Sequence, residues 1–162
     1  MDKLRERIET TKFGLQKSMT RQLSLAEGYI TLERGDYGEA ISHFRKAQEL
    51  LAFPYPGVGG NMGLYAWYFE PLALASYRSG DLEKAQEEYE KISKMTLGRV
   101  ASWDIHAKSF YMLGKISEQR GWPGKAIEHY EKFLEVWKDA DPDLTEVDDA
   151  RQRLARLKSM RD

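Results

Sequence analysis

The stretch that decides the fold is Gly121–Val136, "GWPGKAIEHYEKFLEV". Its first residues, a glycine followed closely by a proline, mark a turn. Ala126, Tyr130 and Phe133 then follow at spacings of four and three residues, which places them on one face of a helix. A single turn and amphipathic helix is typical of many proteins, so its meaning depends on whether the pattern recurs along the chain.

The pattern recurs twice, as "GDYGEAISHFRKAQEL" from Gly35 and as "GDLEKAQEEYEKISKM" from Gly80. Each glycine stands where a preceding helix must end in a left-handed residue, which glycine adopts most easily. In all three copies an alanine follows five residues after the glycine, and an aromatic residue follows four residues later. The alanines and aromatics are Ala40 and Phe44, Ala85 and Tyr89, and Ala126 and Tyr130.

A second helical run precedes each of these glycines and carries a small residue seven positions before it. A small residue there allows the two helices of a pair to approach closely. We therefore expect a unit of helix, tight turn and helix that occurs three times. The small residues are Gly28, Ala73 and Gly114.

These three units resemble tetratricopeptide repeats (TPRs), and the resemblance covers roughly residues 20–138. It implies an all-α fold, an α-solenoid of three TPR-like helix hairpins with a C-terminal capping helix. We expect one TPR-like domain over residues 1–162, similar to cytoplasmic TPR domains of bacterial proteins. Its expected segments are an N-terminal helical extension (1–19), repeat 1 (20–52), a loop insertion rich in Pro and Gly (53–63), repeat 2 (64–95), repeat 3 (102–138) and the capping helix (143–160).

The N-terminal region is expected to be helical, either as one long helix or with a break near Ser18–Thr20. A loose apolar stripe runs along it and would need cover from a partner or from a second copy of the chain. This stripe is the sequence feature that indicates a homo-oligomer. Its residues are Leu4, Ile8, Leu15, Met19, Leu23, Ala26 and Ile30.

The chain has no cysteine and a formal net charge of −1. These values exclude thiol chemistry and Cys-based zinc sites, and they give no basic field to attract nucleic acid or anionic lipid. The three histidines lack companion ligands at metal-binding spacing. The carboxylate pairs Glu87–Glu88 and Asp148–Asp149 are expected to be solvated charges. We therefore expect no enzyme, cofactor, metal, nucleic-acid or membrane function.

In TPR proteins the first helix of each hairpin lines a concave groove, so the resemblance implies a groove that binds a protein. An extended peptide, a partner helix or the chain's own N-terminal helix could each fill it. A known TPR clamp for chaperone tails uses lysines and asparagines, but Leu25, Tyr29 and Pro71 replace three of them here and only Lys108 fits. The expected groove residues are Tyr29, Glu33, Trp67, Glu70, Tyr77, Arg78, Lys108, Tyr111 and Lys115.

Two alternative functions remain open at this point. The chain could be a self-assembling homo-oligomeric scaffold that uses the N-terminal helix or the ends of the array. It could also be a small-molecule sensor or a regulatory domain of a larger signalling protein, with the insertion Phe53–Met62 covering an aromatic pocket at Trp67.

Overall fold

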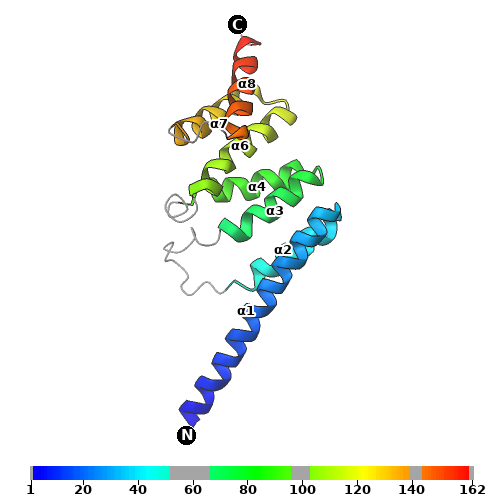
Figure 1. Cartoon of the computed structure of the whole chain (residues 1–162), viewed down its shortest axis with the longest axis vertical. Coiled ribbons are helices and arrows are strands. Elements are labelled where there is room, and N and C mark those ends of the chain that lie inside the picture. The colour runs from blue at the N-terminus through cyan, green and yellow to red at the C-terminus, as the bar shows by residue number, and fades with distance from the viewer. Residues whose placement is uncertain (1, 52–65, 96–102, 139–143, 161–162) are drawn as a thin grey trace. The chain divides into compact units, whose positions relative to one another are not determined.

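The computed structural model of the chain describes residues 2–51, 66–95, 103–138 and 144–160, with side chains from residue 10 onward. Over these ranges every element is an α-helix, which confirms the all-α prediction (Figure 1). The chain divides into two compact units, Met1–Val58 and Gly59–Asp162.

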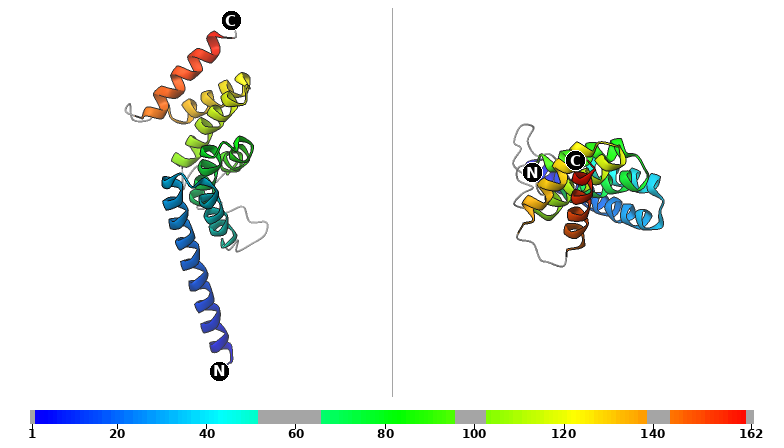
Figure 2. Two further views of the ribbon diagram at one scale, coloured as in Figure 1. Left: turned by 90° about the vertical axis from the view of Figure 1, so that its right-hand side faces the viewer. Right: turned by 90° about the horizontal axis from the view of Figure 1, so that it is seen from above.

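Unit 1 is a hairpin of a very long helix, α1 (Asp2–Arg34), and a shorter one, α2 (Tyr37–Glu49). The alternative with a break near Ser18–Thr20 is wrong, because α1 runs through these residues without interruption. Helix α2 packs beside the C-terminal part of α1, and the N-terminal part of α1 extends well beyond it (Figure 2). The turn between the two helices centres on Gly35, whose φ is +83°.

Unit 2 contains two hairpins and a last helix. The first hairpin is α3 (Ala66–Arg78) with α4 (Leu82–Ser93), and the second is α6 (Trp103–Gln119) with α7 (Pro123–Val136). The capping helix α8 (Thr145–Ser159) follows and packs beside α7. Gly80 and Gly121 form the hairpin turns at positive φ, as the sequence predicts. The predicted loop insertion 53–63 lies outside the described residues, and the expected repeat boundaries stay predictions.

The small residue in the first helix of a hairpin receives the aromatic ring of the second helix. A Cβ atom built on Gly114 would lie 2.5 Å from the ring of Tyr130, and one built on Gly28 would lie 2.5 Å from the ring of Phe44. No side chain larger than hydrogen fits at these places unless the ring moves. In these two hairpins, the sixteen-residue spacing between the glycine and the aromatic residue therefore determines where the two helices pack against each other.

Buried side chains also join each hairpin of unit 2 to the next element. Tyr89 and Ile92 of α4 share a core with Ile105 and Ile116 of α6. A second core joins the later helices, and each hairpin therefore stacks on its successor until α8 closes the series. The second core contains Tyr111, Tyr130, Phe133, Trp137, Val147, Ala150 and Leu157.

Candidate functional site: the first-helix face of unit 2

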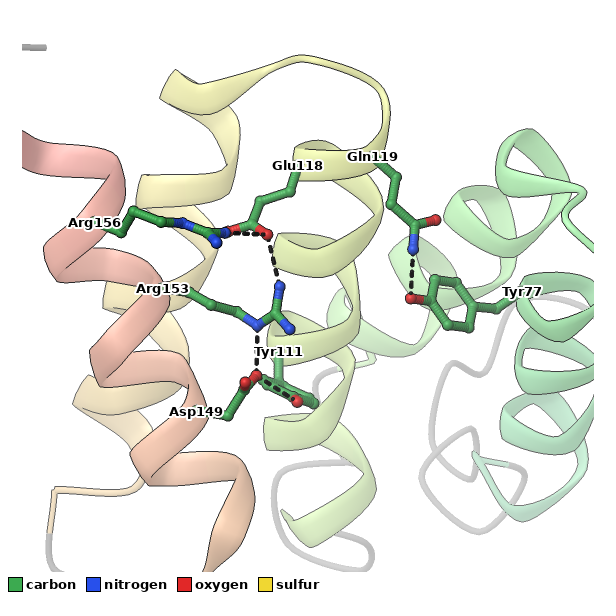
Figure 3. A network of polar contacts seen from close by, with 7 residues as sticks. All are labelled: Tyr77, Tyr111, Glu118, Gln119, Asp149, Arg153 and Arg156. Carbon is green, nitrogen blue, oxygen red and sulfur yellow. Dashed lines mark hydrogen bonds and ion pairs between the residues drawn. The ribbon is translucent and has the colours of Figure 1, made fainter. Parts of the chain in front are cut away.

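The first helices of unit 2, α3 and α6, together with α8, carry a chain of polar side chains that is drawn in Figure 3. We call this surface the first-helix face. The surface forms because the second helices, α4 and α7, pack into the cores between one hairpin and the next element. The first helices are left with a face outside these cores. Seven side chains form the network of hydrogen bonds and ion pairs: Tyr77, Tyr111, Glu118, Gln119, Asp149, Arg153 and Arg156.

The half of the network between α6 and α8 centres on Asp149 and Arg153. The hydroxyl of Tyr111 donates a hydrogen bond of 2.8 Å to Asp149 Oδ2, and Arg153 Nε donates to the same oxygen. Arg153 also pairs with Glu118 at 2.7 Å, and Arg156 approaches Glu118 at 3.3 Å. Each carboxylate therefore meets at least one charged donor, and charge-assisted bonds of this kind are stronger than neutral ones.

These contacts shift the pKa values of the groups involved. Burial alone would raise the pKa of Asp149, but the hydrogen bonds from Arg153 and Tyr111 outweigh it and lower the pKa overall. Burial, together with the hydrogen bond to Asp149, raises the pKa of the Tyr111 phenol. The carboxylate is thus held charged and the phenol held neutral at ordinary pH, and both states favour the link between the two helices.

The middle of the face holds Lys115. Its ammonium lies 5.6 Å from the ring centre of Tyr77 and 5.3 Å from that of Tyr111, which are cation–π distances. Gln119 Nε2 donates a 2.8 Å hydrogen bond to the hydroxyl of Tyr77, which joins α6 to α3. Three of the expected groove residues, Tyr77, Tyr111 and Lys115, are therefore brought together.

The start of α3 and the start of α6 form another part of the face. Trp67 is 53% exposed, although its indole is large and apolar. Burial raises the pKa of the Glu70 carboxyl, and the nearby cations Lys108 and Arg78 offset this only in part. Lys108 also forms an ion pair with α8, since its Nζ lies 3.1 Å from Glu146 Oε1.

Tyr29 and Glu33, the two expected groove residues of unit 1, both lie on α1 and are both exposed. The Tyr29 ring packs edge-on against Phe44 at a centre distance of 5.4 Å, so part of its surface supports the hairpin.

The structure changes the expected role of one groove residue and of two carboxylates. Tyr111 is only 9% exposed and donates its hydroxyl to Asp149, so it supports the face rather than lying open on it. Glu88 is 3% exposed, which makes the expectation of a solvated charge wrong. Its carboxylate is neutralised by Lys91 at 2.8 Å and Lys84 at 3.8 Å, while Oε2 has no hydrogen-bond partner. Asp149 is likewise bonded rather than free in solvent.

The expected set of groove residues omitted the contribution of α8. The sequence does contain one signal, because Asp149 and Arg153 are four residues apart and of opposite charge, which is the spacing of a helical ion pair. This signal does not show that the pair also reaches across to Tyr111 and Glu118 on α6.

Among the residues that the structure describes, no group of three or more His, Cys, Asp or Glu side chains is arranged to hold a metal ion. None of the described helices is both long and apolar enough to cross a bilayer.

Comparisons with known proteins agree with this architecture. A family model described as a tetratricopeptide repeat matches residues 107–136, which cover most of α6 and all of α7. The TPR2AB domain of yeast Sti1, solved as a complex with pHSP90, is similar at a TM-score of 0.67 and 25% identity, over 87% of this chain and 48% of that one. The present chain thus spans about half of that structure.

A TPR-like protein from Chlorobium tepidum is similar at a TM-score of 0.69 and 18% identity, over 90% of this chain and 98% of that one, and this likeness concerns the fold. No curated protein matches the sequence. The predicted helical-repeat solenoid is confirmed by these structures and by the matched repeat. The chain therefore contains a tetratricopeptide repeat at residues 107–136 and has the helical-repeat fold of TPR proteins.

Proposed function

We propose that the chain is a non-catalytic scaffold that binds an extended peptide or a partner helix on the first-helix face of unit 2. A TPR domain is in general a protein-interaction module, which supports the broad class. The finer assignment to this face rests on three features: Lys115 beside the rings of Tyr77 and Tyr111, the exposed Trp67 on α3, and the polar network that joins α6 to α8.

The observation that carries the proposal is the position of Lys115. Its ammonium is held between two tyrosine rings, and none of the described carboxylates forms an ion pair with it. Asp149 is close enough for Lys115 to contribute to lowering its pKa, but the two do not pair. A lysine fixed by rings keeps its donors available, so an acidic side chain or a backbone carbonyl of a bound peptide can accept from it.

Trp67 supplies the complementary apolar contact. Its exposed indole offers a large, rigid surface, and tryptophan is enriched among the residues that dominate binding energy at protein interfaces. The preferred ligand is therefore a peptide with at least one acidic residue for Lys115 and one apolar residue for Trp67.

The Sti1 structure is a complex with pHSP90, but this chain lacks two features of a chaperone-tail clamp. Pro71 is buried inside α3 at one of the places that a chaperone-tail clamp needs. The fitting lysine, Lys108, is already paired with Glu146. The proposal therefore concerns internal acidic and apolar peptide segments.

A selection from a random peptide library on the full chain tests this function. Selected peptides should contain an acidic residue near an apolar one. Calorimetric titration should show about tenfold weaker binding, or more, for Lys115→Ala and for Trp67→Ala, because each loses a contact worth about 1.4 kcal/mol or more. The matched control is Lys132→Ala, since Lys132 lies on the second helix α7 and forms an ion pair with Glu135 of the same helix.

Equal affinity of the wild type and both face variants, or loss of binding in Lys132→Ala alone, would show that the first-helix face is not the binding surface. The alternative of a small-molecule sensor depends on Phe53–Met62, which lie outside the described residues, and it stays a prediction. The cytoplasmic location and the bacterial origin that the resemblance implies also stay predictions.

A further inference from the structure

Helix α1, the first helix of the series, presents an apolar surface at the positions where α6 of unit 2 packs against the preceding hairpin. Aligning Gly28 of α1 with Gly114 of α6, since both receive an aromatic ring, places α1 and α6 in one register. In that register Met19, Leu23 and Ile30 correspond to Ile105, Ser109 and Ile116. The α6 residues are all buried, and the two isoleucines share a core with α4.

The corresponding residues of α1 are exposed. Met19 is 63% exposed, Leu23 is 59% exposed and Ile30 is 52% exposed, and Leu15, one turn earlier, is 63% exposed. The helix thus carries the side chains of a stacking face without a helix of the described chain on top of them. Burying such residues is favourable by roughly 25 cal/mol for each Å² of apolar surface removed from water.

The opposite end of the series is closed in a different way. Helix α8 buries Val147, Ala150 and Leu157 against the preceding hairpin and turns Arg151 and Gln152 outward. A polar outer face is what the last element of a repeat array needs in order to remain soluble. A second copy therefore cannot cover α1 by placing its own α8 end there, because charged side chains would have to be buried.

The spacing of the α1 stripe is symmetric about Met19. Leu15 and Leu23 lie four residues before and after it, and Ile8 and Ile30 lie eleven residues before and after it. At 3.6 residues per turn, all of these positions fall within about 40° of the Met19 direction. A stripe that reads the same from both ends matches an identical stripe running antiparallel to it.

The flanking sequence fits the same arrangement. Arg5 and Glu33 stand fourteen residues before and after Met19 and have opposite charges, so they are opposite each other in an antiparallel pair. Two pairs do not match: Leu4 lies opposite Arg34 at the ends of the helix, and Lys12 lies opposite Ala26, seven residues on either side of Met19. A lysine or arginine stem can cover an apolar side chain while its charged group stays in water. Lys17 and Arg21, which would repel each other in the same register, fall on the far side of the helix.

We propose that α1 pairs with α1 of a second copy of this chain, antiparallel and centred on Met19, to form a two-fold symmetric dimer. The interface is isologous, because both subunits contribute the same surface, the apolar stripe of α1. It uses the outer face of α1 and leaves the first-helix face of unit 2 unused, so the dimer and the peptide-binding proposal can fail independently.

The chain contains no cysteine, so introduced thiols report the pairing directly. Mild oxidation should cross-link Met19→Cys to itself, because the two copies of position 19 meet at the symmetry axis. Leu15→Cys alone should cross-link no more than the control Lys17→Cys, whose thiol lies on the far side of the helix. The variant that carries both Leu15→Cys and Leu23→Cys should cross-link, because positions 15 and 23 lie opposite each other. Self-cross-linking of Leu15→Cys as strong as that of Met19→Cys would indicate a parallel pair and would overturn the antiparallel arrangement.

The mass of the unmodified chain gives the second readout. Sedimentation equilibrium should give two chains per particle for the wild type and one for Met19→Glu, since two carboxylates would meet at the axis. Circular dichroism of Met19→Glu should show the helix content retained, apart from any fraying of the extended part of α1. A wild type that is a single chain at high micromolar concentration, or a Met19→Glu variant that remains dimeric, would overturn the proposal.

Discussion

The hydroxyl of Tyr111 on α6 donates a hydrogen bond of 2.8 Å to the carboxylate of Asp149 on α8, across 38 positions of sequence. This bond joins the last hairpin to the capping helix on the surface that we assign to partner binding. Tyr111 is 9% exposed and the Asp149 side chain is 37% exposed, so the bond is partly shielded from water. The capping helix therefore shapes the face as well as closing the core.

Removing this hydroxyl should weaken the attachment of α8. We expect Tyr111→Phe to lower the free energy of unfolding by about 1 kcal/mol, since Asp149 loses a donor. Tyr77→Phe is the control, because its hydroxyl has an exposed hydrogen bond with Gln119, and its cost should stay within about 0.5 kcal/mol. Urea denaturation of Tyr111→Phe, Asp149→Asn and the double variant measures the coupling energy, and strictly additive effects would contradict a direct link.

The close approach within a hairpin can be tested at one glycine. Gly114→Ala should destabilise the protein by about 1–3 kcal/mol, because its Cβ would overlap the ring of Tyr130. Gly124→Ala in the neighbouring helix α7 meets nothing within 4 Å and should be neutral or slightly stabilising. Thermal denaturation of the two variants compares them, and similar melting temperatures would show that the glycine is not needed for packing.

The raised pKa of the half-buried Glu70 carboxyl predicts a pH effect. Because burial raises its pKa in the folded state above the unfolded value, ionising Glu70 costs stability at neutral pH, and this cost disappears as the pH falls through the folded pKa. Glu70→Gln should therefore raise the melting temperature at neutral pH and leave it nearly unchanged in acid. The control is Glu87→Gln, since hydrogen bonding to Lys84 lowers the pKa of Glu87. A Glu70→Gln variant that is less stable than the wild type at neutral pH would contradict this account.

The sequence predicts the hairpins well because their determinants are local. A glycine that ends one helix, an alanine five residues later and an aromatic residue four residues after that define both the turn and the buried face, as at Gly121, Ala126 and Tyr130. These residues lie within a stretch of ten positions, Gly121 to Tyr130. Three copies in phase therefore specify the repeat without reference to distant parts of the chain.

The site is less predictable because its determinants lie far apart in the sequence. The periodicity of α4 places Glu88 next to exposed positions, but two lysines within four residues neutralise it and allow its burial. In the same way, the composition of α8 indicates a polar cap, whereas only the folded arrangement brings Asp149 and Arg153 onto Tyr111 and Glu118 of α6.

The measurement that tests the central claim most directly is NMR mapping of a library-selected peptide on the full chain, observed through the indole N–H signals of its four tryptophans. We predict that the Trp67 indole signal and the backbone amides around Lys115 shift on binding. The signal of Trp137, whose indole is buried in the core between α6, α7 and α8, should stay in place. Shifts confined to α4 and α7, with the signals of Trp67 and Lys115 unchanged, would contradict the assignment of the first-helix face as the binding surface.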